Sequence, residues 1–183
     1  MVDLELLALR SRRAAEWGRL RVGCRGAALA LLLALLAVVA GSPALAVAGL
    51  GGPLVCVTIG FGWWSAEGAR AVRSGLTLGA IPMAAGLATL AIEGWCDPNR
   101  AMTACGVGCL LAGLAAGGGS AWHAMTTAPA RRLRSWAQIG LVASLTTALG
   151  CVGLGTGSAL AVLGAVVAGA LIGWVPFRLR ARA

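Results

Sequence analysis

Residues 26–42 read GAALALLLALLAVVAGS and directly follow a segment that is rich in arginine. This uncharged stretch is apolar on every side of a helix, whereas a water-soluble helix carries an apolar stripe on one face only. At ~1.5 Å per residue, it is close to the length that crosses the ~30 Å hydrocarbon core of a bilayer. The stretch therefore predicts a membrane-spanning helix.

Five further apolar stretches of similar length follow, at 44–64, 75–94, 101–119, 136–153 and 158–177. Of the 183 residues, 59% are hydrophobic and 11% charged, whereas roughly a quarter of a soluble domain is charged. We expect an all-α polytopic membrane bundle with six transmembrane helices. Its divisions are a helical cytoplasmic arm at 1–25, a membrane domain at 26–177 and a cytoplasmic tail at 178–183.

The arginines predict how the spans are oriented. All 15 basic residues are arginine, and 14 of them lie in the arm, the tail and the polar segments at 65–73 and 120–135. Only Arg100 falls on the other side. Since positively charged loops stay in the cytoplasm, both chain ends are expected inside a bacterial inner membrane. Residues 44–46, Ala-Leu-Ala, also resemble a signal-peptide cleavage site, but the second span starts there, which disfavours cleavage.

The formal net charge of +9 has two interpretations. A basic protein can bind nucleic acid, but arginines beside membrane spans are neutralised by anionic lipids. We favour the bilayer as the partner and expect no direct binding to nucleic acid. The sequence contains neither a catalytic Ser/His/Asp set nor an HExxH motif, and His123 is its only histidine. We expect neither an enzyme nor a cofactor.

Three glycine pairs have GxxxG spacing: Gly75/Gly79, Gly113/Gly117 and Gly169/Gly173. Small residues one turn apart let two helix backbones approach closely. We expect these pairs to form contacts within the bundle. A homodimer built on the same faces is the alternative.

Cysteine is the residue type with candidate chemistry. The predicted topology places four of the six cysteines at or near the outer face, namely Cys96, Cys105, Cys109 and Cys151. Three interpretations stay open: a small apolar packing residue, a structural or redox-active disulfide with Cys151 in an oxidising periplasm, and a thiol site that senses a soft metal or an oxidant. No residue is assigned as a metal ligand.

The arm carries the candidate partner-binding residues. Arg10, Arg13, Trp17 and Arg21 recur at helical spacing. One interpretation is a helix that lies on anionic lipid. The other is a docking helix for a soluble cytoplasmic partner.

The layout resembles the six-span bacterial anti-sigma factors of the NrsF type, which are negative regulators of extracytoplasmic-function sigma factors. The features that carry the resemblance are the arginine-rich arm, six short spans, Trp95-Cys96 through Cys105, Trp122 ahead of the arginines at 131, 132 and 134, Cys151 closing the fifth span, and Gly169-Ala-Leu-Ile-Gly173 before the final arginines. The chain departs from the family in having Val152-Gly153 after Cys151 instead of the proline and histidine that often follow there.

The resemblance implies that the arm holds a cytoplasmic sigma factor at the membrane. It also implies that a change at the outer cysteines shifts the bundle and releases the sigma factor. Two other functions stay open. One is a small permease or heavy-metal transport protein that uses Cys105 and Cys109. The other is an accessory subunit of a membrane complex, which would use its glycine faces as the contact.

Overall fold

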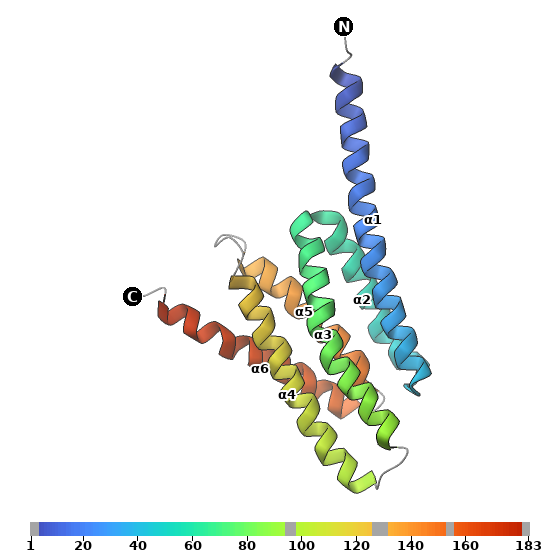
Figure 1. The fold of residues 1–183 in the computed structure, drawn as a ribbon, viewed down its shortest axis with the longest axis vertical. Helices are drawn as coiled ribbons and strands as arrows, with labels where there is room; N and C mark the ends of the chain where they lie inside the picture. Colours follow the sequence, from blue (N-terminus) through green and yellow to red (C-terminus); the bar gives the residue numbers. More distant parts are fainter. Residues whose placement is uncertain (1–3, 94–97, 126–131, 153–155, 181–183) are drawn as a thin grey trace.

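The computed structural model describes residues 4–93, 98–125, 132–152 and 156–180, and within these ranges the chain is helical with no strand. The helices are α1 (Leu4–Val39), α2 (Ala44–Trp64), α3 (Ala66–Glu93), α4 (Pro98–Met125), α5 (Arg132–Cys151) and α6 (Thr156–Arg180). They form a bundle from which the amino-terminal half of α1 projects (Figure 1). The predicted all-α fold is confirmed.

Successive helices run in opposite directions. The end of α2, the start of α3, the end of α4 and the start of α5 lie on the side of the bundle from which α1 projects, which we call the arm end (Figure 1). The α1–α2 turn lies on the opposite side. Among the residues that the structure describes, three helical segments are long and apolar enough to cross a membrane: Arg10–Val39, Ala44–Trp64 and Ala66–Ala88. A shorter apolar segment is Leu160–Gly173.

The turn between α1 and α2 shows why the first span stops where it does. Gly41 has a φ of +94°, which glycine adopts without steric cost. The amide of Gly41 donates to the Val38 carbonyl, and the amide of Ser42 donates to the Ala37 carbonyl, both at 3.0 Å. These two bonds form a Schellman motif that satisfies the last carbonyls of α1.

Two segments that the sequence suggested as polar loops are largely helical. Of residues 65–73, only Ser65 is outside a helix, so Arg70 and Arg73 lie on the first turns of α3. Ser65 is extended and accepts a 2.9 Å hydrogen bond from the Gly68 amide through its hydroxyl oxygen, as an N-cap does. Helix α4 likewise continues through the polar residues up to Met125. The helices therefore extend beyond the ends of the apolar stretches.

The bundle is held by three extensive pairings, α3 with α5, α4 with α6 and α1 with α2. Glycine lines each of these contacts. A Cβ on Gly75 would lie 2.7 Å from the Cβ of Val142, and one on Gly79 would lie 2.8 Å from the Ala143 carbonyl oxygen. Between α4 and α6, a Cβ on Gly173 would lie 2.8 Å from the Ala121 Cβ.

The remaining glycines of the predicted pairs are equally crowded. Gly113 faces Ala165 and Val162, Gly117 faces the Val166 backbone, and Gly169 faces the Leu114 backbone. The expected packing of all three GxxxG pairs within the bundle is therefore confirmed. These glycines contact other helices of the same chain, and the homodimer and accessory-subunit contacts stay predictions.

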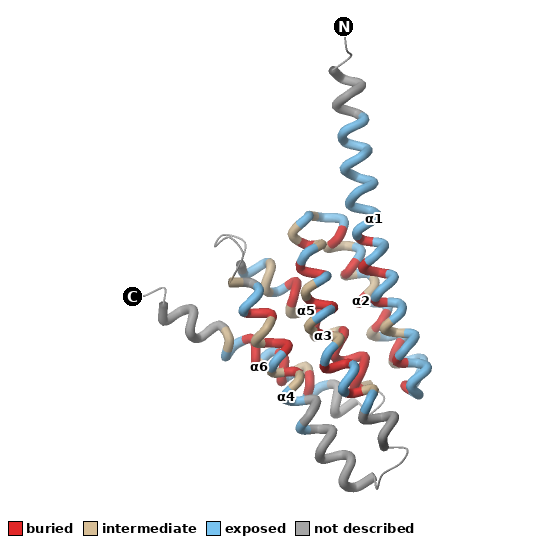
Figure 2. The backbone as a smooth tube through the Cα atoms, viewed as in Figure 1, coloured by how far each residue is buried: buried red, intermediate tan, exposed pale blue. Residues whose placement is uncertain are grey.

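Small residues make up much of the bundle interior, beside larger side chains such as Leu54, Met83 and Leu149. Many of the buried residues are alanine or glycine, including Ala30, Ala37 and Ala143. Large apolar side chains lie outside: five leucines of α1, at positions 29, 31, 32, 35 and 36, are 47–61% exposed. Figure 2 shows buried residues along the helix–helix contacts and exposed ones outside. Such an extended apolar exterior is unstable in water and suits a lipid environment.

Hydroxyl groups buried within the helices bond to carbonyls of their own helix, whereas the buried hydroxyl of Ser42, in the α1–α2 turn, has no hydrogen-bond partner among the described residues. Thr146 and Thr147 donate to the carbonyls of Val142 and Ala143, four residues back, at 2.8 and 2.7 Å. Thr58 and Ser120 donate to carbonyls three residues back. These bonds remove the cost of an unsatisfied polar group in an apolar interior.

Candidate functional site

The arm is the amino-terminal part of a single helix that continues into the first apolar stretch. Helix α1 runs from Leu4 to Val39 without a break at the predicted boundary after residue 25. Its 36 residues correspond to about 54 Å at ~1.5 Å per residue, whereas a hydrocarbon core is ~30 Å thick. The arm therefore extends away from the bundle along the helix axis.

This continuity bears on the two interpretations of the arm. A helix that lies flat on lipid must bend before it enters the bilayer as a span, and α1 continues as one helix through this region. Residues 10–22 are all exposed, and Trp17 is 73% exposed. Residues 10–22 of the arm thus form an uncovered helix that stands out from the bundle.

The predicted partner-binding residues share one face of this helix. Arg10, Arg13, Trp17 and Arg21, here called the arm stripe, are spaced at three, four and four residues, so they align on a 3.6-residue helix. The side of α1 that is buried against the bundle carries Gly23, Gly26, Ala27, Ala30 and Ala37. Helical periodicity places the arm stripe on roughly the opposite side of α1.

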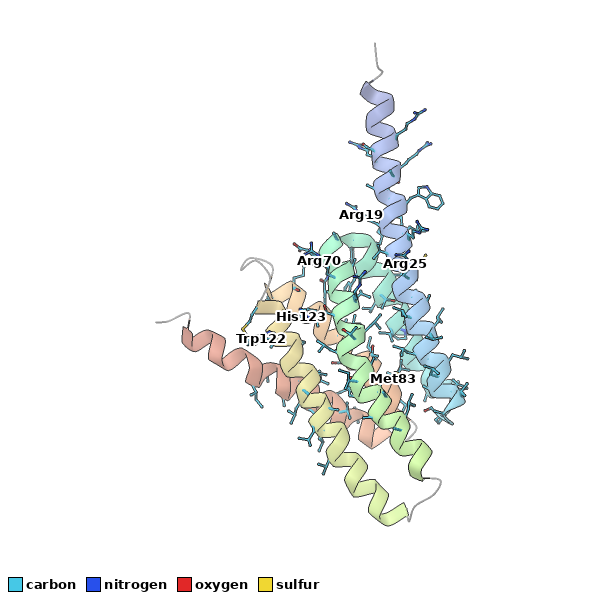
Figure 3. The ribbon with its side chains drawn as sticks, in the orientation of Figure 1. Arg19, Arg25, Arg70, Met83, Trp122 and His123 are labelled. Carbon is cyan, nitrogen blue, oxygen red and sulfur yellow. The ribbon has the colours of Figure 1, made fainter. Side chains whose placement is uncertain are left out.

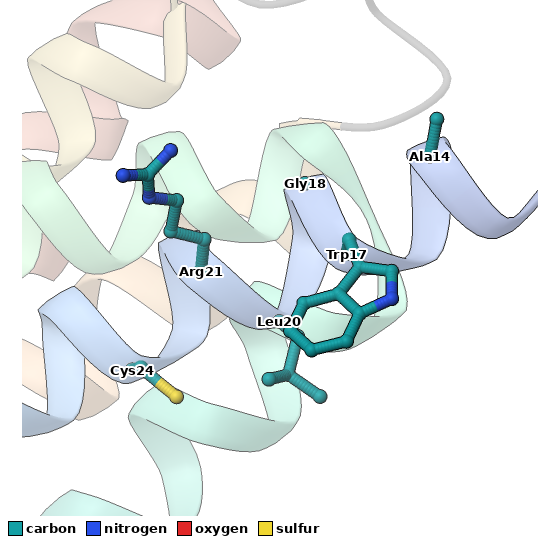
Figure 4. A pocket seen from close by; sticks show the side chains of 6 residues that line it. All are labelled: Ala14, Trp17, Gly18, Leu20, Arg21 and Cys24. Atoms are coloured by element: carbon teal, nitrogen blue, oxygen red, sulfur yellow. The ribbon is translucent and has the colours of Figure 1, made fainter.

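A shallow apolar groove lies along the arm stripe. It is lined by Ala14, Trp17, Gly18, Leu20, Arg21 and Cys24, all from α1 (Figure 4). The indole of Trp17 and the side chain of Leu20 stand beside the small residues Ala14 and Gly18. Since one helix cannot enclose a cavity, the groove is a surface that a second helix could cover. The sequence analysis predicted Trp17 and Arg21 as partner-binding residues but not Leu20 and Cys24. Their spacing of three and seven residues from Trp17 would have placed both on the same face of the helix.

The charge of the arm is strongly positive. Residues 1–25 hold six arginines, at positions 10, 12, 13, 19, 21 and 25, against the acids Asp3, Glu5 and Glu16, and Glu16 is the acid between Arg10 and Arg25. Arg19, Arg25 and Arg70 lie toward the arm end of the molecule (Figure 3). A partner of the arm therefore needs an acidic surface with an apolar strip.

Of the four candidate cysteines, the structure describes the side chain of Cys151. Cys151 is the last residue of α5 and is 0% exposed. It packs in a small cluster with Ala116 of α4 and with Val162 and Val166 of α6. Cys96 lies outside the described residues, and the side chains of Cys105 and Cys109, in α4, also lie outside the described set. The pairing predicted for these thiols stays a prediction.

The burial of Cys151 favours the packing interpretation for this residue. Its Sγ lies 3.6 Å from the position that a Cβ on Gly86 of α3 would take, so the thiol fills the space beside that glycine. A buried thiol in apolar surroundings is poorly reactive toward aqueous oxidants. Among the described residues, no three His, Cys, Asp or Glu side chains gather as a metal site.

Comparisons with protein-family models, with curated proteins and with solved structures find no match to this chain. What the fold defines is a helical bundle with helices that are long and apolar enough to cross a membrane. Its function has to be inferred from the exposed basic arm and from the chemistry around it.

Proposed function

We propose that the chain is a six-span protein of the bacterial inner membrane that holds a sigma factor at the cytoplasmic face through the arm stripe. The observation that carries the proposal is the uncovered basic helix, which is continuous with the first apolar span and exposes Trp17 on the side away from the bundle. The sigma factor as the partner comes from the resemblance in layout to NrsF-type anti-sigma factors.

The chemistry of the arm stripe fits a helix-on-helix contact. Large aromatic and arginine side chains supply most of the free energy in protein interfaces, and the stripe has both types beside the groove of Trp17 and Leu20. Alanine and glycine at positions 14 and 18 leave room for a partner helix to approach. The arginines would steer an acidic sigma-factor surface toward this groove.

The response to a periplasmic signal is a separate part of the proposal. Because Cys151 is enclosed by α4 and α6 side chains, a response through this thiol would require those contacts to open, and Cys96, Cys105 and Cys109 are the other candidates. A change at these residues reaches the arm only if it shifts the bundle between two states. Such coupling between sites is typically 1–3 kcal/mol.

Co-purification from membranes of the source bacterium tests the docking, with captured sigma factors identified by mass spectrometry. The test variants are Trp17→Ala/Leu20→Ala and the charge reversal Arg10→Glu/Arg13→Glu/Arg21→Glu. The matched control is Arg12→Glu/Arg19→Glu, on the other side of α1. Loss of a Trp anchor costs about 2 kcal/mol or more, so retention of the sigma factor should fall by about 30-fold.

The control variant should retain the sigma factor, and transcription from promoters of that sigma factor should rise only in the test variants. Failure of the intact protein to retain any sigma factor after chemical crosslinking would contradict the proposal. Equal losses in the test and control variants would also contradict it, because they would mean that only the net charge of the arm matters.

A further inference from the structure

A cleft between α1, α2 and α3 combines apolar walls with two arginines. It is lined by Val22, Arg25, Gly26 and Leu29 of α1, Thr58 and Gly62 of α2, and Ala69, Val72, Arg73, Leu76 and Thr77 of α3. Its volume is about 190 Å³. Among the described residues, no acidic side chain lines it, so these supply no carboxylate to the two guanidinium groups within the cleft.

Small residues keep the cleft open. Gly26 and Gly62 contribute no side chain to it, and a Cβ on Gly26 would lie 3.1 Å from Cγ1 of Val72. The two threonine hydroxyls already bond within their helices: Thr58 donates to the Val55 carbonyl, and Thr77 donates to the carbonyls of Arg73 and Ser74. The arginines are thus the main groups left to recognise a ligand by charge.

The position of the cleft is where lipid head groups are expected. It lies at the base of the arm, where the exposed arginines of α1 give way to the exposed leucines that begin at Leu29. Basic pockets between helices on the cytoplasmic side of a membrane bind anionic phospholipid head groups. A ligand here meets positive charge at one end and an apolar wall at the other.

We propose that this cleft binds one anionic phospholipid, with its phosphate between Arg25 and Arg73 and the start of one acyl chain along Leu29, Val72 and Leu76. A water molecule occupies about 30 Å³ of liquid, so the cleft has room for a phosphate group and a few methylenes. The rest of the lipid lies outside, against the exposed α1 leucines. The proposal goes beyond sigma-factor docking and is independent of it, because Arg25 lies outside the arm stripe.

Thermal unfolding of the full chain in a mild detergent tests the site, with phosphatidylglycerol, phosphatidylcholine or inorganic phosphate added separately. The test variant is Arg25→Gln/Arg73→Gln. The matched control is Arg19→Gln/Arg70→Gln, which removes the same charge from the same two helices outside the cleft. We expect phosphatidylglycerol alone to raise the unfolding temperature of the wild type and the control.

The test variant should bind phosphatidylglycerol about 30-fold more weakly, since each arginine near the membrane surface contributes about 1 kcal/mol to anionic lipid binding. Equal effects of phosphatidylglycerol and phosphatidylcholine on the wild type would overturn the proposal. An equal effect of inorganic phosphate would also overturn it in favour of a free-anion site. Loss of sigma-factor retention in the test variant, with unchanged lipid binding, would assign the arginines to partner docking instead.

A second measurement needs no variant. Phosphatidylglycerol with a photoreactive group near the start of its acyl chain should crosslink to wild-type peptides that contain residues 22–29 and 69–77. The same probe on phosphatidylcholine should give crosslinks spread over the exposed leucines. Indistinguishable crosslink patterns for the two lipids would refute the site even if the glutamine variant fails to fold.

Discussion

Gly62 of α2 lies against Gly23 of α1, so that a Cβ on Gly62 would stand 2.8 Å from the Gly23 Cα. This contact brings the two helix backbones together at the base of the arm, beside the proposed lipid cleft. Small residues therefore do more than fill space here. They fix where the arm leaves the bundle.

The glycine contact between α3 and α5 is expected to be sensitive to a single methyl group. In Gly79→Ala, the new Cβ would lie 2.6 Å from Thr146 Cβ, so the helices must move apart. Overpacking of this kind costs about 1–3 kcal/mol. Gly140→Ala in α5 is the control, since a Cβ there meets nothing within 4 Å, and it should be neutral or stabilising by up to ~1 kcal/mol. Denaturant unfolding in detergent measures both, and equal effects would contradict this packing.

The proposed orientation predicts which positions react from outside the cell. In a background without native cysteines, Ala40→Cys lies at the α1–α2 turn and Arg70→Cys lies near the start of α3, and both residues are exposed. A membrane-impermeant maleimide should label Ala40→Cys in intact spheroplasts and Arg70→Cys only after permeabilisation. The reverse pattern, or equal labelling at both positions, would exclude an arm on the cytoplasmic side.

The native cysteines are expected to differ widely in reactivity. Cys24 is exposed and lies on the arm groove, whereas Cys151 is buried at the end of α5. A water-soluble maleimide should modify Cys24 ~100-fold faster than Cys151 in the folded protein, because the buried thiol reacts only during local opening. Mass spectrometry of digested samples measures both rates. Comparable rates would show that Cys151 is accessible and would make it a sensor candidate again.

The arm is expected to behave as a rigid extension of the first span. Spin labels on Arg12→Cys and Arg70→Cys, in the same cysteine-free background, should give a narrow distance distribution by pulsed electron resonance. Gly18→Pro should broaden it, because an internal proline removes a helix hydrogen bond and costs ~3 kcal/mol. Gly18→Ala is the control, since its Cβ meets nothing within 4 Å. A broad distribution in the unmodified arm would contradict a continuous α1.

The sequence was most informative about the ends of a helix where a single residue type sets the boundary. The predicted second stretch, 44–64, coincides with α2, because Pro43 precedes it and Ser65 follows it. Helix α2 continues without a break through Gly51-Gly52-Pro53. The arm was predicted to be helical and the first apolar stretch to begin at residue 26, and α1 joins both in one helix from Leu4 to Val39, since arginine, leucine and alanine favour helix whether or not lipid surrounds them.

The sequence does not show which helices pack against one another. The GxxxG spacing of Gly75/Gly79 and Gly113/Gly117 predicts close approach but does not specify a partner. The pairing of α3 with α5 and of α4 with α6 depends on the shape of all six helices together. The burial of Cys151 likewise depends on Ala116, Val162 and Val166 from two other helices. The cleft is lined by residues of three helices, so no local sequence motif predicts it.

The placement of small residues inside and leucines outside reverses the usual rules of mutational tolerance. In this bundle, enlarging an inward position such as Gly150, where a Cβ would lie 2.6 Å from the Met83 Cα, does more harm than truncating an outward leucine such as Leu35. As the sequence diverges during evolution, side chains at the helix contacts should therefore stay small. The lipid-facing positions should exchange freely among leucine, valine and isoleucine. Distant relatives of this chain would then share a pattern of sizes more than a pattern of residues.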